Sequence, residues 1–380
     1  MGFLTGWMMV FGYAMVVPGG VALTSAYASL LAAHLHVTVW PGVLFLAILT
    51  GAILVAYLGI RPSSTTDLIL VVGGMAVIAA LAITILIKIG LESYSAAAFS
   101  PGSTPGRGVN DIATAMIYGI AAFAGFEAAA ALSEEARNTR RSVPGSIIGI
   151  VVITGAFYLL VVLAETFGVG RNGIGDLVGH PSPLGYLASR YWSPSAVWVI
   201  DLVVVLTGLG FVVAATNAAI RVLFAMGRDR ALPESLARLS GRQTPVAAIG
   251  CLTVITLVLG LPLTYAVGAA AASGYLFACA GLAVVLVHLA GNVAVIRAFR
   301  TEFRDEFKRG RHLLIPAAGV VILLFPLWGI LHPGTYSLIN LLPFIGLAWL
   351  CLGILAAGVL RARRPAVFAK LGTTSMPGGS

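Results

Sequence analysis

Charged residues are scarce in this sequence. Asp, Glu, Lys and Arg together make up 10% of its 380 residues, whereas a typical soluble domain contains about 25% of them. Hydrophobic residues account for 59% of the chain. A chain with so few charges cannot cover a water-exposed surface with polar side chains. The composition therefore excludes a soluble globular protein and predicts an integral membrane protein.

Cysteines and the motifs of common enzymes are also lacking. The three cysteines, Cys251, Cys279 and Cys351, lie far apart in apolar runs, which excludes a disulfide framework and a Cys-X-X-Cys metal site. His34 and His36 have no further metal ligand at a suitable spacing. The sequence contains no His-Glu-x-x-His or Gly-x-Ser-x-Gly motif. We therefore expect a protein that is not an enzyme and that carries no cofactor and no metal.

The sequence does contain a series of long apolar runs. A helix needs about 20 apolar residues to cross the roughly 30 Å hydrocarbon core of a bilayer. By that rule we predict an all-α integral membrane protein with ten transmembrane helices over residues 1–364, followed by a disordered cytoplasmic tail over residues 365–380. The predicted spans are Trp7–Ala33, Val39–Ile60, Asp67–Ile87, Ile112–Leu132, Ser146–Gly168, Ser195–Met226, Pro245–Tyr265, Gly274–Ile296, Leu313–Leu331 and Leu338–Leu360.

The 23 basic residues are distributed unevenly between the two sides of the membrane. All except Lys88, Arg107, Arg171 and Arg190 fall on the side of the two termini. Because cytoplasmic loops carry the excess of Lys and Arg, we predict a multi-pass protein of the cell (plasma) membrane with both termini in the cytoplasm. Topology also accounts for the net charge of +9, so we expect no nucleic acid as a partner.

Three connections between spans have a distinct composition. Ile89–Asp111 and Val169–Pro194 on the outer side are rich in Gly, Pro and Ser, which predicts exposed loops. Arg297–His312 on the inner side contains three phenylalanines spaced four residues apart, which predicts a surface helix with the three rings on one face. Asp201 and Glu165 lie near the outer ends of their spans, where we expect water to solvate them.

A glycine and a carboxylic acid interrupt the fourth span. An ionised carboxyl group at the centre of a membrane helix costs roughly 2.5 to 3.5 kcal/mol on insertion scales, so we expect Glu127 to face a protein cavity or to remain protonated. Gly125 lets the helix open without a side-chain clash, and backbone that is freed inside a membrane must line a cavity. The stretch therefore predicts a discontinuous helix at a midplane site, which is the usual position of a transporter's binding site.

Two segments carry a resemblance to a known family. Phe123–Glu127, followed by Glu134–Glu135 and Asn138–Pro144, resembles the sixth-helix signature of the amino acid-polyamine-organocation transporters, with a threonine in place of the family's usual proline. Asn217–Arg221 and Met226–Pro233 resemble the family's eighth helix and the cytoplasmic loop that follows it. The two signatures stand in the same order as in the family and on the same predicted side.

The resemblance implies a secondary active transporter, a permease that moves amino acids or related amines by alternating access. It also implies a LeuT-type fold, in which five helices are repeated with inverted topology and the broken first and sixth helices face each other across the substrate. The fourth span here matches the sixth family helix, so the ten spans correspond to family helices three to twelve. The fold would then be truncated at its N-terminus, either because the sequence starts late or because the protein is a reduced relative.

The resemblance also implies site residues. We expect the substrate to be bound by residues of the break and the helix before it, namely Tyr118, Phe123, Ala124, Gly125, Phe126 and Glu127. We expect coupling or gating to involve Glu127, Asn217, Arg228 and Asp229, the last two as an inner gate pair. These residues also have structural alternatives. Glu127 would stabilise the break, the aromatic rings would pack in the core, and Asn217 would form a hydrogen bond between helices.

The coupling ion and a second function class stay open. Many proton-coupled relatives carry a lysine midway along the helix that corresponds to Asp67–Ile87, but this stretch contains none. Coupling to H+ through another residue, coupling to Na+, and exchange of substrates all remain. The alternative to a transporter is a non-transporting membrane sensor or assembly subunit with the same fold.

Overall fold

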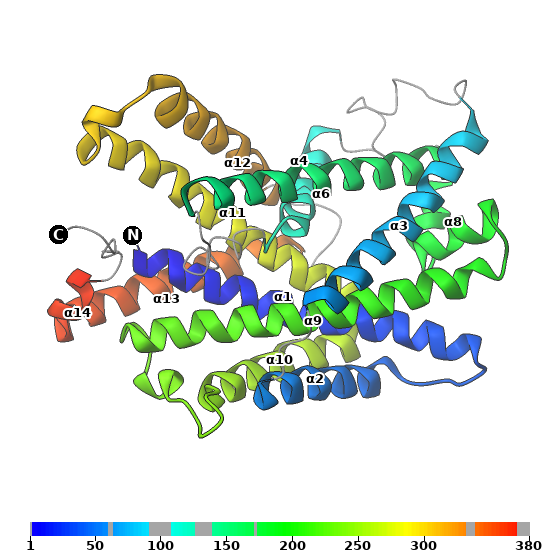
Figure 1. Ribbon diagram of the computed structural model, residues 1–380, viewed down its shortest axis with the longest axis horizontal. Coiled ribbons are helices and arrows are strands. Elements are labelled where there is room, and N and C mark those ends of the chain that lie inside the picture. The colour runs from blue at the N-terminus through cyan, green and yellow to red at the C-terminus, as the bar shows by residue number, and fades with distance from the viewer. Residues whose placement is uncertain are drawn as a thin grey trace.

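The computed structural model describes residues 2–59, 64–90, 108–125, 139–170, 173–331 and 339–370, and every regular element among them is helical (Figure 1). The α-helices are α1 (Gly2–His34), α2 (Pro41–Leu58), α3 (Ser64–Ile89), α4 (Val109–Ala122), α6 (Thr139–Val169), α7 (Ile174–Gly179), α8 (Pro183–Tyr191), α9 (Ala196–Arg228), α10 (Val246–Val267), α11 (Ala269–Thr301), α12 (Ile315–Leu331), α13 (Leu342–Arg363) and α14 (Pro365–Lys370). Short 3-10 helices cover Glu234–Ala237, Arg304–Glu306 and Ile339–Leu341, and a π-helix covers Gly310–Leu314.

Nine of the helices in the described ranges are long and apolar enough to cross a membrane. They coincide with nine of the ten predicted spans. The remaining predicted span, Ile112–Leu132, corresponds to the shorter helix α4, which ends at Ala122; the rest of that span, beyond Gly125, lies outside the described residues. The prediction of an all-α membrane protein with about ten spans is confirmed.

Helices α1, α9 and α11 form the centre of the molecule. Each is 33 residues long, which corresponds to about 50 Å at 1.5 Å per residue and exceeds the thickness of a bilayer core. Helix α1 makes its most extensive contacts with α11 and α9, and α1 and α9 run side by side through the middle of Figure 1. They are antiparallel, because His34 at the end of α1 contacts Asp201 near the start of α9. We call the two ends of the molecule the Gly2 end and the His34 end.

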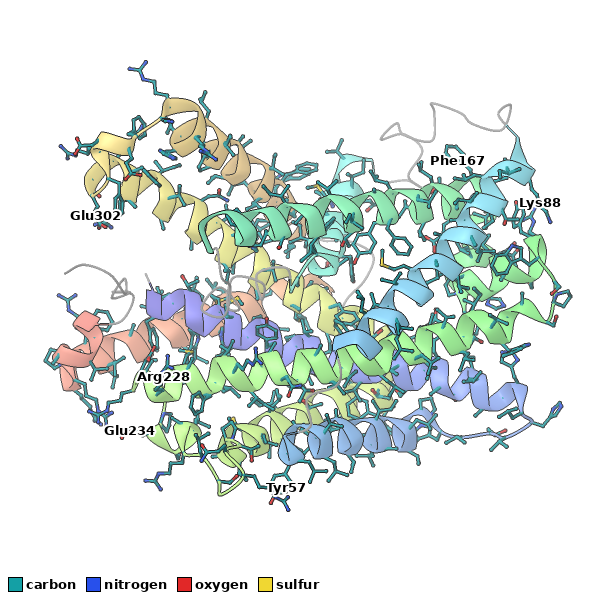
Figure 2. The ribbon with its side chains drawn as sticks, viewed as in Figure 1. Tyr57, Lys88, Phe167, Arg228, Glu234 and Glu302 are labelled. Carbon is teal, nitrogen blue, oxygen red and sulfur yellow. The ribbon has the colours of Figure 1, made fainter. Side chains whose placement is uncertain are left out.

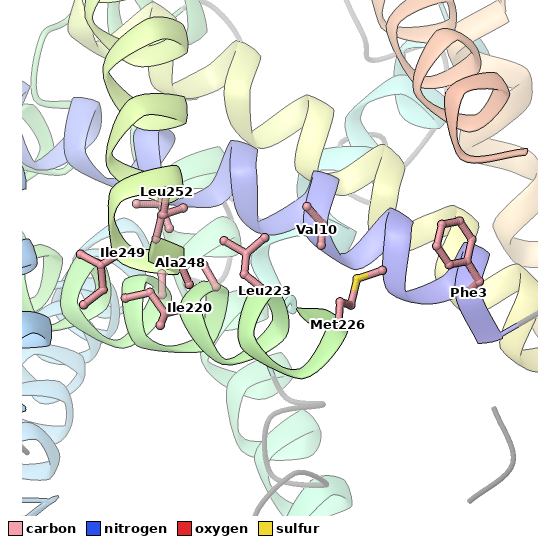
Figure 3. Close-up of a cluster of buried hydrophobic side chains, with 11 residues drawn as sticks. Phe3, Val10, Ile220, Leu223, Met226, Ala248, Ile249 and Leu252 are labelled. Atoms are coloured by element: carbon pink, nitrogen blue, oxygen red, sulfur yellow. The ribbon is translucent and has the colours of Figure 1, made fainter. Parts of the chain in front are cut away.

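Apolar side chains hold α1 to its neighbours at the Gly2 end. Phe3 and Val10 of α1 belong to one buried cluster with Leu223 and Met226 of α9 and with Leu252 of α10 (Figure 3). Burying each such side chain contributes roughly 1.5 to 3 kcal/mol relative to exposing it in water. Within a bilayer, close packing supplies the corresponding stabilisation between helices.

A reciprocal pair of tryptophans joins α1 to α13. The rings of Trp7 and Trp349 stack with centroids 4.7 Å apart. Trp7 Nε1 donates to the Trp349 carbonyl oxygen at 2.9 Å, and Trp349 Nε1 donates to the Trp7 carbonyl oxygen at 3.1 Å. Both indole N–H groups are therefore satisfied inside the protein, as buried polar groups require. The contact places α13 and α14 at the same end of the molecule as the start of α1 (Figure 1).

The connection predicted as the exposed loop Val169–Pro194 is instead partly helical and partly buried. It contains α7 and α8, and Leu187 and Ala188 of α8 belong to a buried cluster with residues of α3, α6 and α9. Ser182 caps α8, because its hydroxyl accepts a hydrogen bond from the Gly185 N–H at 3.2 Å. The Gly- and Pro-rich composition therefore marked short helices with tight turns, and the prediction of a simple exposed loop was wrong.

The segment Arg297–His312 is not the single surface helix that the spacing of its phenylalanines predicted. Helix α11 continues to Thr301, and a 3-10 turn and a π-helix follow it. The His312 ring stacks on Phe299 with centroids 3.6 Å apart, which folds the segment back on itself. At the C-terminus, residues 365–370 of the expected disordered tail form the short helix α14, and residues 371–380 lie outside the described part.

Candidate functional site

Helix α4 ends at the position where the sequence predicts a break. After Ala122 the chain turns through Phe123, Ala124 and Gly125. The N–H groups of Phe123 and Ala124 donate to carbonyl oxygens three residues earlier, at 3.1 and 3.0 Å, which tightens the last turn. Gly125 has φ +110°, a conformation that residues with a Cβ atom rarely adopt. The glycine therefore directs the chain out of the helix.

Close packing of α4 against α11 and α12 fixes the position of this turn. Ile117 of α4 is fully buried against α11, where Gly281 leaves no room for a side chain beside the α4 backbone. On the other side, a Cβ atom at Gly329 of α12 would lie 2.7 Å from the Thr114 backbone nitrogen. Two glycines on two helices thus allow α4 to pack backbone to backbone, as small residues do between membrane helices.

A cavity of about 200 Å³ lies next to the turn. It is bordered by three central helices and by the residues that follow α4. The lining residues are Met9, Gly12, Tyr13 and Val16 of α1, Ala124 and Gly125 of the turn, Phe211, Ala214, Ala215 and Ala218 of α9, and Val284 of α11. Pockets for drug-sized ligands measure about 300 to 1,000 Å³, and an apolar cavity of about 150 Å³ accepts benzene. This space therefore suits a single small molecule.

The walls of the cavity are almost entirely apolar. Of the side chains that line it, only that of Tyr13 carries a strong hydrogen-bonding group. Ala124 and Gly125 of the turn border the same cavity. The arrangement is suited to a ligand with one apolar part, which contacts the side chains, and one polar part, which is placed at the turn.

The sequence profile of the amino acid permease family matches residues 1–346. The chain belongs to this family. The branched-chain amino acid permease BcaP of Lactococcus lactis is 27% identical to this chain over 232 residues, which cover 58% of this chain and 47% of the relative. BcaP of Bacillus subtilis is 24% identical over 277 residues, covering 68% and 57%. The uncharacterized transporter Rv1999c of Mycobacterium tuberculosis is 26% identical over 250 residues, covering 63% and 51%. The chain thus spans about half the length of the curated relatives it matches.

The structure brings two of the predicted substrate-binding residues to the cavity. Ala124 and Gly125 line it. Phe123 instead packs edge-on against Tyr158 of α6, with ring centroids 5.3 Å apart. Tyr118 packs against the buried cluster that includes Phe11. Phe126 and Glu127 lie outside the described residues, so their roles stay predictions.

The predicted coupling and gating residues that the structure describes do not line the cavity. Asn217 is half-buried on α9 but does not line the cavity. Arg228 and Asp229 form an ion pair with Nε and Oδ1 3.5 Å apart, and their side chains are 68% and 54% exposed. Such an exposed pair contributes little to stability. Its gating role, like that of Asn217, stays a prediction.

Sequence reasoning missed the walls that α1, α9 and α11 contribute. On α1, Met9, Tyr13 and Val16 recur at the helical spacing of three to four residues, and Phe211 and Ala218 mark a similar stripe on α9. A spacing search would have found both stripes. However, buried packing faces have the same period, so the sequence did not distinguish a cavity wall from a core.

A polar cluster at the His34 end was also not expected. Asp201 was predicted to be solvated, but it is only 1% exposed. Its Oδ1 accepts a hydrogen bond from the Ser182 hydroxyl at 2.6 Å, and its Oδ2 lies 3.0 Å from His34 Nε2. The prediction of solvation was wrong because the segment before α8 folds over the start of α9 and covers the carboxylate.

Proposed function

We propose that this chain belongs to a secondary transporter that moves amino acids with aliphatic side chains across the cell membrane by alternating access. The observation that carries the proposal is the apolar cavity between α1, α9, α11 and the broken end of α4. Apolar walls favour an aliphatic side chain, and backbone at a helix break in a membrane commonly binds the charged groups of a substrate. The two BcaP relatives are named as branched-chain amino acid permeases, which agrees with a substrate of this class.

In this proposal Ala124 and Gly125 hold the main-chain part of the substrate, together with Phe126 and Glu127 from the next residues of the break. The aliphatic part lies against Tyr13, the alanines of α9 and Val284. Glu127 links binding to helix movement. These roles rest on the position of the turn at the cavity and on the family to which the chain belongs.

We also propose that the Gly2 end faces the cytoplasm. Arg228, Glu234 and Glu302 lie at this end, whereas Lys88 lies at the opposite end (Figure 2). Most basic residues of the sequence fall in the loops of the Gly2 end. Positive charge accumulates on the cytoplasmic side of membrane proteins, so the distribution supports this orientation in the plasma membrane.

The test is uptake of radiolabelled L-leucine by proteoliposomes that contain the purified chain. We expect saturable uptake that L-isoleucine and L-valine inhibit more strongly than D-leucine, L-lysine or L-glutamate. Parallel vesicles with an inward Na+ or H+ gradient identify the ion that accelerates uptake. Binding without uptake would instead support the non-transporting alternative, and the absence of stereoselective binding would overturn the proposal.

A variant of Glu127, the acid at the break, tests its role in the same uptake assay. We expect Glu127→Gln to reduce leucine uptake at least about tenfold, as loss of a functional intramembrane carboxyl would. The matched control is Glu234→Gln, because Glu234 begins a short 3-10 helix at the surface, where its exposed side chain is paired with Arg230 at 3.3 Å. Equal uptake by both variants would remove Glu127 from the mechanism.

A further inference from the structure

Two phenylalanine rings close the cavity on the side that faces the His34 end. Phe211 of α9 lines the cavity, and Phe277 of α11 meets it edge-on with ring centroids 6.2 Å apart and planes at 69°. Phe211 precedes the other α9 lining residues, and α9 runs antiparallel to α1, so its ring forms the wall nearest the His34 end. A substrate side chain that extends in this direction meets the Phe211 ring.

The Phe211 ring lies against a glycine of α1. A Cβ atom added at Gly20 would lie 2.6 Å from Phe211 Cε1 and 2.9 Å from Cδ1, distances that real Cβ contacts do not reach. Gly20 itself is buried and lies one turn beyond Val16, the last cavity residue of α1. The space left by the missing side chain is therefore the space that the ring occupies.

We propose that Phe211 sets the upper size limit of the substrate side chain and that Gly20 is the positioning residue that holds the ring at the edge of the cavity. This inference rests on the function proposed above and names the residues that select within its substrate class. A side chain at Gly20 displaces the ring from its place on α1. Phe277 lies against one side of the ring, and the cavity borders another. Phe211 is 42% exposed, so the proposal requires that the displaced ring moves toward the cavity, where it shortens the space, rather than away from it.

The neighbouring glycine provides a matched control. A Cβ atom at Gly19 would crowd Phe277, at 3.1 Å from Cε1 and 3.2 Å from Cδ1. Phe277 does not line the cavity. Gly19→Ala therefore introduces the same methyl group at the adjacent position of the same helix, where it crowds Phe277 and Leu276 of α11 but does not directly crowd a residue that lines the cavity.

The experiment measures how strongly alanine, valine, leucine, methionine and phenylalanine raise the unfolding temperature of each purified variant. Ligands that bind the folded state raise it according to their affinity. We expect Phe211→Ala to increase affinity for phenylalanine relative to leucine about tenfold or more, the discrimination that one or a few methylene groups provide in an apolar pocket. We expect Gly20→Ala to decrease affinity for leucine relative to alanine by a similar factor.

A double variant distinguishes a change in the position of the Phe211 ring from nonspecific damage to the protein. Gly20→Ala combined with Phe211→Ala should restore the leucine-to-alanine ratio, because the methyl group no longer has a ring to displace. Gly19→Ala should keep the wild-type ratios. Unchanged ratios in both single variants, a matching change in Gly19→Ala, or no rescue in the double variant would overturn the inference while leaving wild-type amino acid binding intact. A wild-type chain that binds none of the five amino acids would overturn the proposed function itself.

Discussion

Gly125 has a backbone conformation that other residues avoid. The effect of a substitution there on protein stability can therefore be tested independently of the substrate. Its φ is +110°, and among the described residues, apart from its chain neighbours, no atom lies within 4 Å of the position that a Cβ atom would take, so Gly125→Ala introduces backbone strain without a steric clash with this part of the chain. We expect it to lower the free energy of unfolding by about 1 to 3 kcal/mol and to reduce leucine binding, because the turn at the cavity shifts. Thermal unfolding in detergent, with and without leucine, measures both effects.

Gly119 is the control for this substitution, because it lies in the same helix and also has open space around its Cβ position. Its backbone is regularly helical, so Gly119→Ala should leave stability unchanged or raise it by up to about 1 kcal/mol. If both alanine variants behave alike, the strain at Gly125 has no part in the site.

At the scale of single residues, the sequence predicted the helix break that an unusually placed glycine marks. It missed the cavity walls that common apolar and aromatic residues form. Gly125 was identified because it lies beside Glu127, an acid that is costly inside a membrane unless it serves the fold or the site, and because a glycine lets the helix open there. Tyr13 and Phe211 were missed because an aromatic residue in an apolar helix packs in a core as readily as it lines a cavity. Only the three-dimensional arrangement of α1, α9 and α11 separates the two roles.

At the scale of elements, the buried carboxylate of Asp201 connects three segments. It bonds to His34 at the end of α1 and to Ser182 before α8, while Asp201 itself belongs to α9. The other titratable or charged side chains of this region include Tyr27 and Glu165. We expect Asp201→Ala to lower the free energy of unfolding by about 1 to 3 kcal/mol, because it leaves the buried Ser182 hydroxyl without its acceptor. Thermal unfolding in detergent tests this expectation.

An exposed aspartate just beyond the other end of the same helix gives the comparison. Asp229→Ala removes only the 3.5 Å pair with Arg228, which lies at the surface, so its cost should stay below about 1 kcal/mol. Equal losses of stability in the two variants would show that the Asp201 cluster does not hold α8 and α1 together.

The lengths of apolar runs predicted the long helices well, since crossing a bilayer requires a minimum length. The connections were predicted less well. Helices α7 and α8 are short and stabilised by contacts with α3, α6 and α9, which no local pattern reveals. The three phenylalanines after Arg297 have a helical spacing, but stacking of His312 on Phe299 favours a reversal of the chain over one continuous helix.

At the scale of the whole molecule, the antiparallel central helices and the shared location of the start of α1 and of α14 agree with an even number of crossings (Figure 1). Which end faces the cytoplasm is decided by charge. Single cysteines placed at the two ends of a variant without Cys251, Cys279 and Cys351 report this directly.

Thr38 and Lys308 are suitable positions, because both side chains are exposed, one in the connection after α1 at the His34 end and the other in the connection after α11 at the Gly2 end. We expect a membrane-impermeant maleimide to label Thr38→Cys in intact cells and to label Lys308→Cys only after the membrane is permeabilised. This expectation follows from the proposed orientation, in which the excess of Arg and Lys holds the Gly2 end in the cytoplasm during insertion. The opposite labelling pattern would invert the orientation, and the Phe211 side of the cavity would then face the cytoplasm instead of the outside.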